Sequence, residues 1–367
     1  MNRIKFIKQL SLTTIGLFVL SKLGFAQTKK MKNAAIKSIK PLVLPWETQD
    51  PFIFCSYHYD EFPGGNENME PNASLEGRRL GQDFASKDGW NMYHGANVPG
   101  FPVHPHSGFE TVSVVTKGMV DHSDSLGGNG RFGNGDVQWL TSGKGAQHSE
   151  MFPLLNADKN TFEIFQLWLN LPKKSKKVDP YYQMLWSEDI PKIKFTDGNG
   201  NTTEVDLIAG KLNGQTALSP NPDSWAADPE NNVQIWTLKL DSNAKYVIEG
   251  INEDVTRTLY FYNGNSIAIN DTEVSEKRLI HLNSTEEIQI QNSSEIAYLF
   301  FLQGKPINEP LVQHGPFVAN SQEGIQETMQ AYRKTQFGGW PYNTNEPVHD
   351  KKIGRFARFA NGEETIK

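Results

Sequence analysis

Three histidines and one glutamate of this sequence have the spacing of ligands to a metal ion. His104 and His106 are separated by one residue, and so are His148 and Glu150. Residues two apart on a β-strand point to the same side, so each pair could direct both side chains to one point. A single inward histidine is more often a hydrogen-bonded core residue, but two converging pairs favour a metal. Neutral imidazoles with a carboxylate suit divalent iron, manganese, copper or nickel, and they would leave octahedral positions open for water, substrate or dioxygen.

The segments around these residues predict short β-strands. After His106, the residues Glu110, Val112 and Val114 all have even numbers, so they would point to one side of a strand. If the strand is unbroken, His104 and His106 point to the same side. Such a strand would carry histidines and valines on one inward face. A glycine-rich turn at 126–136 then leads into a second strand, which ends at the second ligand pair.

The second half of the chain also predicts a β-sandwich or barrel. Its strand candidates follow one another at regular intervals. They are 233–240, 257–264, 266–270, 277–283, 286–292 and 297–304. Between about 195 and 310 the single histidine is His281, so we expect no metal site there.

Near the end of the chain, residues 320–334 predict an α-helix. Asn320 is a possible N-cap because Glu323 follows three residues later. Apolar residues recur at helical spacing: Ile325, Met329 and Tyr332. We expect this stripe to pack against the rest of the protein.

Composition excludes several classes of protein. The 367 residues suit two ordinary domains, and an apolar content of 37% favours a folded chain. The net charge of −6, with no dense basic patch outside 29–40 and 173–177, argues against nucleic-acid binding. A single cysteine, Cys55, excludes an internal disulfide and disfavours a thiolate-rich zinc site.

The first residues resemble an export signal. Three basic residues among the first eight precede a short apolar run, 10–20, and the small residues Gly24 and Ala26. The run is too short, and too soon followed by Lys22, to span a bilayer comfortably. We expect residues 1–26 to be cleaved and the protein to be periplasmic, without stable membrane insertion. The alternatives are an uncleaved anchor, or a cytoplasmic protein if the segment does not function as a signal.

Three segments together resemble the pirin family, a branch of the bicupins. They are HPHSGFETVSVVTKGMVDHSDSLG at 104–127, GDVQWLTSGKGAQHSEMFP at 135–153 and QHGPFVANSQEGIQETMQAYRKTQFG at 313–338. The segments occur in the family's order and spacing, and the combination is more specific than any single piece.

The resemblance implies an all-β fold with two cupin (double-stranded β-helix) barrels packed face to face, and a short C-terminal helix. A mononuclear metal is expected in the first barrel, whereas the second has lost its ligands. The expected organisation is a signal peptide at 1–26, a metal-binding cupin domain at 40–170, a linker at 171–192, a second cupin domain without a metal site at 193–340 and a tail at 341–367.

Carried over from the family, the metal ligands are His104, His106, His148 and Glu150. In the wider cupin superfamily the carboxylate ligand lies a few residues after the first histidine pair, which here is Glu110. Because the pirin pattern uses the later glutamate, we prefer Glu150 and expect Glu110 to orient a histidine. Three further histidines are not expected in the site: we interpret His122 as structural, and His58 and His94 lie in stretches that look irregular.

Some pirins resemble quercetin 2,3-dioxygenases, which open the central ring of a flavonol with O2. The resemblance therefore implies a dioxygenase that acts on a small phenolic substrate with one divalent transition metal. Fe²⁺ is the expected ion, with Mn, Cu, Ni or Zn as alternatives, and no flavin or nicotinamide is needed. Glu150 is the expected catalytic group, because a carboxylate at the metal can accept the substrate's proton. The alternative is a metal-dependent binding, regulatory or redox-sensing protein without turnover.

Overall fold

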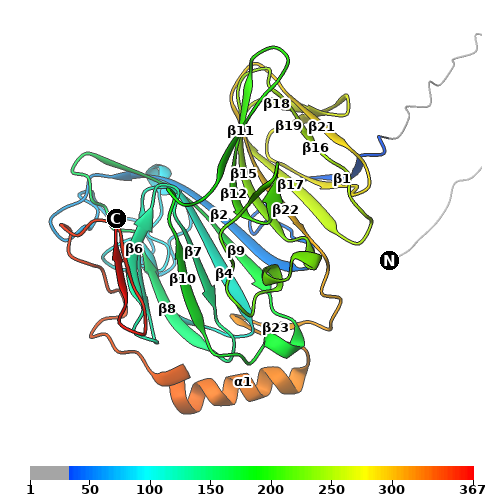
Figure 1. Ribbon diagram of the computed structural model, residues 1–367. Helices are drawn as coiled ribbons and strands as arrows, with labels where there is room; N and C mark the ends of the chain where they lie inside the picture. Colours follow the sequence, from blue (N-terminus) through cyan, green and yellow to red (C-terminus); the bar gives the residue numbers. More distant parts are fainter. Residues whose placement is uncertain (1–32) are drawn as a thin grey trace, which may run out of the picture. The chain divides into compact units, whose positions relative to one another are not determined.

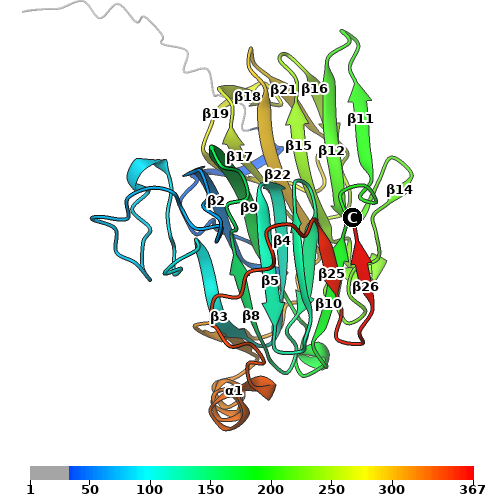
Figure 2. The ribbon, with the colours of Figure 1, turned by 90° about the vertical axis from the view of Figure 1, so that its left-hand side faces the viewer.

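The computed structural model describes residues 33–367 (Figures 1 and 2), and two pairs of β-sheets form most of its regular structure. Each pair forms one barrel, which confirms the prediction of an all-β protein with two cupin barrels and a C-terminal helix. The signal peptide predicted at 1–26 lies outside the described residues. Within the described part of the chain, no helix is long and apolar enough to cross a membrane.

The first barrel consists of a five-stranded and a six-stranded antiparallel sheet. In spatial order, the five-stranded sheet contains β10 Tyr181–Leu185, β7 Val137–Thr141, β4 Phe109–Lys117, β9 Lys159–Asn170 and β2 Phe52–Pro63. The six-stranded sheet contains β26 Glu364–Ile366, β25 Phe356–Arg358, β6 Asn129–Gly133, β5 Met119–Asp124, β8 Ala146–Met151 and β3 Gly100–His106.

The second barrel pairs a seven-stranded sheet with a four-stranded one. The larger sheet contains β1 Ile36–Pro41, β20 Arg278–Leu282, β17 Thr256–Asn263, β22 Ala297–Gly304, β15 Gln234–Leu240, β12 Thr202–Ala209 and β11 Lys192–Thr196. The smaller contains β16 Lys245–Ile248, β21 Ile288–Asn292, β18 Ser266–Ile269 and β19 Thr272–Ser275. All six strands predicted for this half of the chain are present.

Short elements lie in the connections between these strands. Two small hairpins are formed by β13 Lys211–Leu212 with β14 Gln215–Thr216, and by β23 Val312–His314 with β24 Phe317–Ala319. The 3₁₀ turns are η1 Lys87–Gly89, η2 Lys173–Ser175, η3 Trp225–Ala227, η4 Pro229–Asn231 and η5 Gln336–Gly338.

The barrels meet through the five-stranded sheet of the first and the seven-stranded sheet of the second. One buried apolar cluster contains Val112 and Phe165 from the five-stranded sheet and Tyr260 and Phe300 from the seven-stranded sheet. The rings of Phe165 and Phe300 stack with centroids 4.6 Å apart. Two sheets that bury apolar faces against each other exclude water from both. The barrels are therefore packed face to face, as predicted.

Three strands belong to barrels in which their positions in the sequence did not predict them. β1 pairs with β20 of the second barrel, although it comes before the first. β10 lies in the predicted linker, yet it pairs with β7 of the first barrel. In the predicted tail, β25 pairs with β6. Linker and tail thus complete the first barrel, because its open sheet edges gain hydrogen-bond partners from them.

The predicted helix is confirmed as α1, Gln322–Thr335, below the first barrel in Figure 1. Its N-cap is Ser321, whose Oγ accepts a hydrogen bond from Gly324 N at 3.1 Å, and not Asn320 as predicted. Asn320 instead donates to Pro310 O at 2.9 Å. Ile325 is buried against β24, so the predicted apolar stripe packs on the protein.

Candidate metal centre

The three predicted histidine ligands lie together on two neighbouring strands of the first barrel. β3 and β8 pair antiparallel, with His104 directly opposite His148. The Nε2 atoms of these two residues are 3.0 Å apart. His106 completes a group whose candidate ligand atoms all lie within 4.8 Å of one another. The adjacency follows from the strand register, which sequence spacing alone did not determine.

The hydrogen bonds of these rings fit a bound cation. His104 Nδ1 lies 2.8 Å from Pro102 O, so a neutral ring donates there and keeps a lone pair on Nε2. Both ring nitrogens of His106 and Nδ1 of His148 are buried and have no hydrogen-bond partner within residues 33–367. A buried polar atom of this kind costs free energy unless another group satisfies it. Two imidazoles bound at right angles about 2.1 Å from one ion would have nitrogens about 3.0 Å apart, as the Nε2 atoms are.

Burial keeps these imidazoles neutral. Loss of hydration lowers the pKa of His104, and it lowers the pKa values of His106 and His148 well below the ordinary value. The neighbouring imidazoles lower the last two further. His106 also packs edge-on against Phe109 and Trp168, at centroid distances of 5.1 and 5.4 Å. Neutral rings are the form that binds metal, since protonation removes the lone pair.

Glu150 lies beside the histidines and is held by two neutral donors. Its Oε1 accepts a hydrogen bond from Ser113 Oγ at 2.9 Å, and its Oε2 accepts one from Gln166 Nε2. Oε2 is 3.7 Å from Nε2 of His148. The carboxylate is therefore next to the three-histidine group, although it is not one of the residues whose ligand atoms all lie within 4.8 Å of one another.

Glu110 does not orient a histidine, so that prediction is wrong. Its Oε1 accepts from Thr141 Oγ1 at 2.7 Å and its Oε2 from Ser224 Oγ at 2.5 Å. The parity argument fails because β3 and β4 belong to different sheets. Between them the chain turns at Gly108, whose φ of 87° is in the left-handed region that glycine adopts readily. Consequently Ser113, not Glu110, is the residue of β4 that reaches the site.

A cavity of about 660 Å³ reaches the histidine group. His104 and His106 contribute to its lining, with Gln166 close to Glu150. The other lining residues are mostly aromatic or apolar, together with Ser56 and two further histidines: Phe54, Phe84, Phe101, Pro102, Val103, Trp168, Pro316, His58 and His94. Pockets of this kind, apolar with a few converging polar groups, are typical of small-molecule sites.

Two of these cavity histidines were missed in the sequence. His58 lies in β2, not in an irregular stretch, and its Nε2 is 2.8 Å from Ser56 Oγ. His94 lies in the long connection between β2 and β3, where Nδ1 is 2.6 Å from Gly81 O. The stretch around His58 has no clean alternation of apolar and polar residues, so the sequence pattern gave no strand signal there. His122, interpreted as structural, lies with its ring centroid 5.6 Å from that of His148 and its Nε2 3.0 Å from Asp124 Oδ2.

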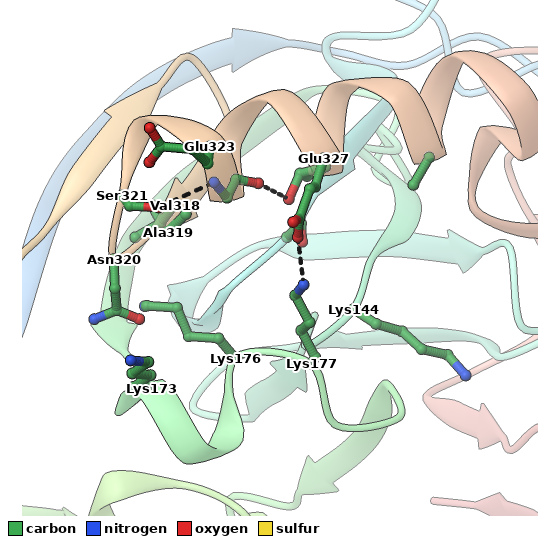
Figure 3. Close-up of a pocket in the computed structure, with 14 residues that line it drawn as sticks. Lys144, Lys173, Lys176, Lys177, Val318, Ala319, Asn320, Ser321, Glu323 and Glu327 are labelled. Atoms are coloured by element: carbon green, nitrogen blue, oxygen red, sulfur yellow. Dashed lines mark hydrogen bonds and ion pairs between the residues drawn. The ribbon is translucent and has the colours of Figure 1, made fainter.

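A second cavity, of about 550 Å³, lies between α1 and the turn around η2 (Figure 3). Four lysines line it, but Lys177 forms an ion pair with Glu327 at 2.6 Å. Lys144 forms an ion pair with Asp179 and points away from the helix in Figure 3. Lys176 donates to Gly108 O at 2.8 Å, so it supports the turn that follows His106. This cavity has no imidazole among its lining residues, and the candidate site is the cavity beside the histidines.

Two face-to-face β-barrels with a histidine group inside the first define the protein as a bicupin. The family model described as Pirin matches residues 47–169, and the model described as Pirin C-terminal cupin domain matches residues 235–338. The chain therefore belongs to the pirin family.

Individual relatives agree with this assignment. The chain is 32% identical to human pirin over 255 residues, which cover 68% of this chain and 81% of that protein. It is 33% identical over 238 residues to a Pseudomonas aeruginosa protein provisionally named quercetin 2,3-dioxygenase, covering 64% of this chain and 79% of that protein. The crystal structure of a quercetin 2,3-dioxygenase from Acinetobacter baumannii matches with a TM-score of 0.62 and 28% identity, over 79% of this chain and 87% of that one.

Proposed function

We propose that this protein is a mononuclear, metal-dependent dioxygenase that opens the central ring of a flavonol with O2. The observation that carries the proposal is the cavity of about 660 Å³, lined by aromatic rings, that reaches His104 and His106. Relatives whose names refer to quercetin 2,3-dioxygenase support the same substrate class.

In this proposal, one divalent cation is held by His104, His106, His148 and Glu150. Fe²⁺ is the proposed ion, with Mn, Cu, Ni and Zn as alternatives. A bound cation supplies Lewis acidity, which lowers the pKa of a phenolic hydroxyl in the cavity. The electron-rich phenol itself supplies electrons for the reaction with O2, so no flavin or nicotinamide is required.

Glu150 is the proposed proton acceptor. Among the residues that the structure describes, Gln166 of the cavity lining is the one hydrogen-bond partner of Oε2, whereas Ser113 holds Oε1. The carboxylate could therefore exchange the Gln166 hydrogen bond for a substrate hydroxyl while it remains anchored at Oε1. General-base catalysis needs this kind of positioned oxygen within hydrogen-bond reach of the proton.

The cavity walls suit a flat aromatic ligand. Phe54 and Trp168 lie with ring centroids 4.6 Å apart, and Phe101 extends the aromatic lining. Contact with these rings would remove apolar surface of the ligand from water and orient its plane. Polar sugars or charged peptides would gain less from such walls.

Oxygen uptake with quercetin tests the proposal. Protein loaded with Fe²⁺ or Mn²⁺ should consume O2 and bleach the flavonol absorption band, and His104→Ala should lose both signals. A flavone without the 3-hydroxyl should be inert, since it lacks the hydroxyl that would bind the cation and give its proton to Glu150. If the loaded protein binds quercetin but consumes no O2 with any of these metals, the dioxygenase proposal fails. A binding, regulatory or redox-sensing protein without turnover would then explain the site.

A further inference from the structure

The cavity has a second polar position, formed by Ser56 and His58 on β2. Both side chains line the cavity together with Phe54, because alternate residues of a strand share a face. From the adjacent strand β9, Gln166 and Trp168 line the same cavity. The histidine cluster, in contrast, belongs to β3 and β8 of the opposite sheet. The cavity is therefore lined by imidazoles from both sheets of the barrel.

The hydrogen bonds of His58 leave one ring nitrogen available. Nε2 lies 2.8 Å from Ser56 Oγ, and among the described residues Nδ1 has no hydrogen-bond partner. Burial lowers the pKa of this imidazole to about 4, so the ring is neutral at pH 7. A serine hydroxyl can donate or accept, so Nδ1 can take either role as well. A ligand hydroxyl, which also donates and accepts, is the complementary group.

The surrounding residues hold the His58 ring in place. Tyr93 packs edge-on against it at a centroid distance of 4.7 Å, and Phe101 lies at 5.8 Å. The hydroxyl of Tyr93 donates to Asp60 Oδ2 at 2.5 Å, which ties the β2–β3 connection back to β2. Tyr93 has a φ of 57°, a conformation that a bulky residue keeps only where its surroundings impose it. His58 therefore offers a hydrogen bond of fixed direction without an ordering cost at binding.

We propose that His58 is a specificity-determining residue, and that its Nδ1 hydrogen-bonds a hydroxyl group on the part of a flat phenol remote from the metal centre. The inference rests on the proposed function and narrows its substrate class. The preferred ligands are polyphenols with hydroxyl groups on more than one ring, rather than phenols with a single hydroxyl.

Anaerobic binding to the metal-loaded protein tests this inference without turnover. Quercetin is compared with 3-hydroxyflavone, which keeps the 3-hydroxyl but has no other, and Kd is measured by quenching of tryptophan fluorescence. His58→Phe should weaken quercetin binding about 3- to 10-fold, the usual loss for one buried hydrogen bond. It should leave 3-hydroxyflavone binding and metal content unchanged. His58→Asn, whose amide can replace Nδ1, should restore most of the quercetin affinity.

The other outcomes are distinguishable. If His58→Phe weakens both flavonols equally, the residue shapes the cavity and does not read a hydroxyl, and the inference is overturned. Equal affinity of wild type and variant for quercetin overturns it as well. If neither flavonol binds to the wild-type protein, the proposed function itself fails and the inference falls with it. Binding that discriminates the two ligands without any O2 uptake would support the inference while refuting the dioxygenase.

Discussion

Ser113 donates a hydrogen bond from Oγ to Oε1 of Glu150 across the interior of the first barrel, over 2.9 Å. Both residues are buried, on β4 and β8. The neighbours of Ser113 on β4, Val112 and Val114, belong instead to the apolar cluster between the barrels. One face of β4 thus serves the interface, and the other holds the carboxylate of the proposed metal centre.

Ser113→Ala should weaken metal binding about 10-fold or more, because partners that orient a ligand commonly contribute 10- to 100-fold to metal affinity. The matched control is Ser149→Ala, which removes a buried hydroxyl on β8 that has no hydrogen-bond partner in the described part of the chain. Competition with a chromophoric chelator measures both affinities. Equal affinities in the two variants would show that the Ser113 hydrogen bond does not position Glu150.

His104→Ala and His148→Ala should each abolish binding of one equivalent of a first-row transition metal. Each variant removes one of three converging imidazoles from a site with few other ligands. Elemental analysis of purified protein measures the stoichiometry, and His314→Ala, at an exposed position, is the control. A full equivalent of metal in both cluster variants would disprove the ligand assignment.

The two buried glutamates should differ in their effect on metal content. Glu150→Gln should weaken binding, since it removes the carboxylate charge 3.7 Å from His148 Nε2. Glu110→Gln should leave the metal in place, because Glu110 is hydrogen-bonded to Thr141 and Ser224 and not to the histidines. The opposite ranking would mean that the ligand carboxylate has been assigned to the wrong strand.

Regular strands were predictable where alternation and turns coincide. The six predicted strands of the second half alternate apolar and polar residues or form apolar runs between turn residues, and all are present. β16 and β19 were not predicted, because strands of four residues carry little periodic signal; β18 has the same length and was predicted from the alternation in Ser266–Ile269. β25 was missed for another reason: its partner β6 lies more than two hundred residues away in sequence, and local patterns carry no information on such pairing.

The grouping of His104, His106 and His148 was predictable because each pair of proposed ligands lies within one strand, where parity holds. The side to which Glu110 points could not be inferred from that of His106, because the chain turns at Gly108 and continues in the other sheet. The cavity residue His58 was overlooked for a related reason. Its stretch mixes aromatic, polar and acidic residues, so the strand shows no clean alternation of burial.

We propose that residues 1–26 are removed during export, which places the mature N-terminus near Gln27. N-terminal sequencing of the native protein from the periplasmic fraction should find this start. A protein that begins at Met1 and is recovered from the cytoplasmic fraction would contradict the proposal. Such a result would also favour the regulatory alternative over an exported enzyme.

Glu110 should make the stability of the fold depend on pH. Burial raises the pKa of its carboxyl group from 4.5 to about 7 in the folded protein. A group with a raised pKa binds its proton more tightly when folded, so its contribution to stability is complete below pH 4.5. That contribution is lost as the pH rises through about 7, where the carboxylate becomes charged in a buried environment.

Glu110→Gln should remove this dependence, because the amide stays neutral and the hydroxyls of Thr141 and Ser224 can donate or accept. Urea unfolding of both proteins at pH 5 and pH 8 provides the measurement. The free energy of unfolding of the wild type relative to the variant should fall between these pH values by on the order of 3 kcal/mol, which corresponds to the pKa shift. Titrations of the remaining groups cancel in this difference. A constant difference across the range would show that Glu110 is ionised at both pH values, and that its two hydroxyl donors compensate for its burial.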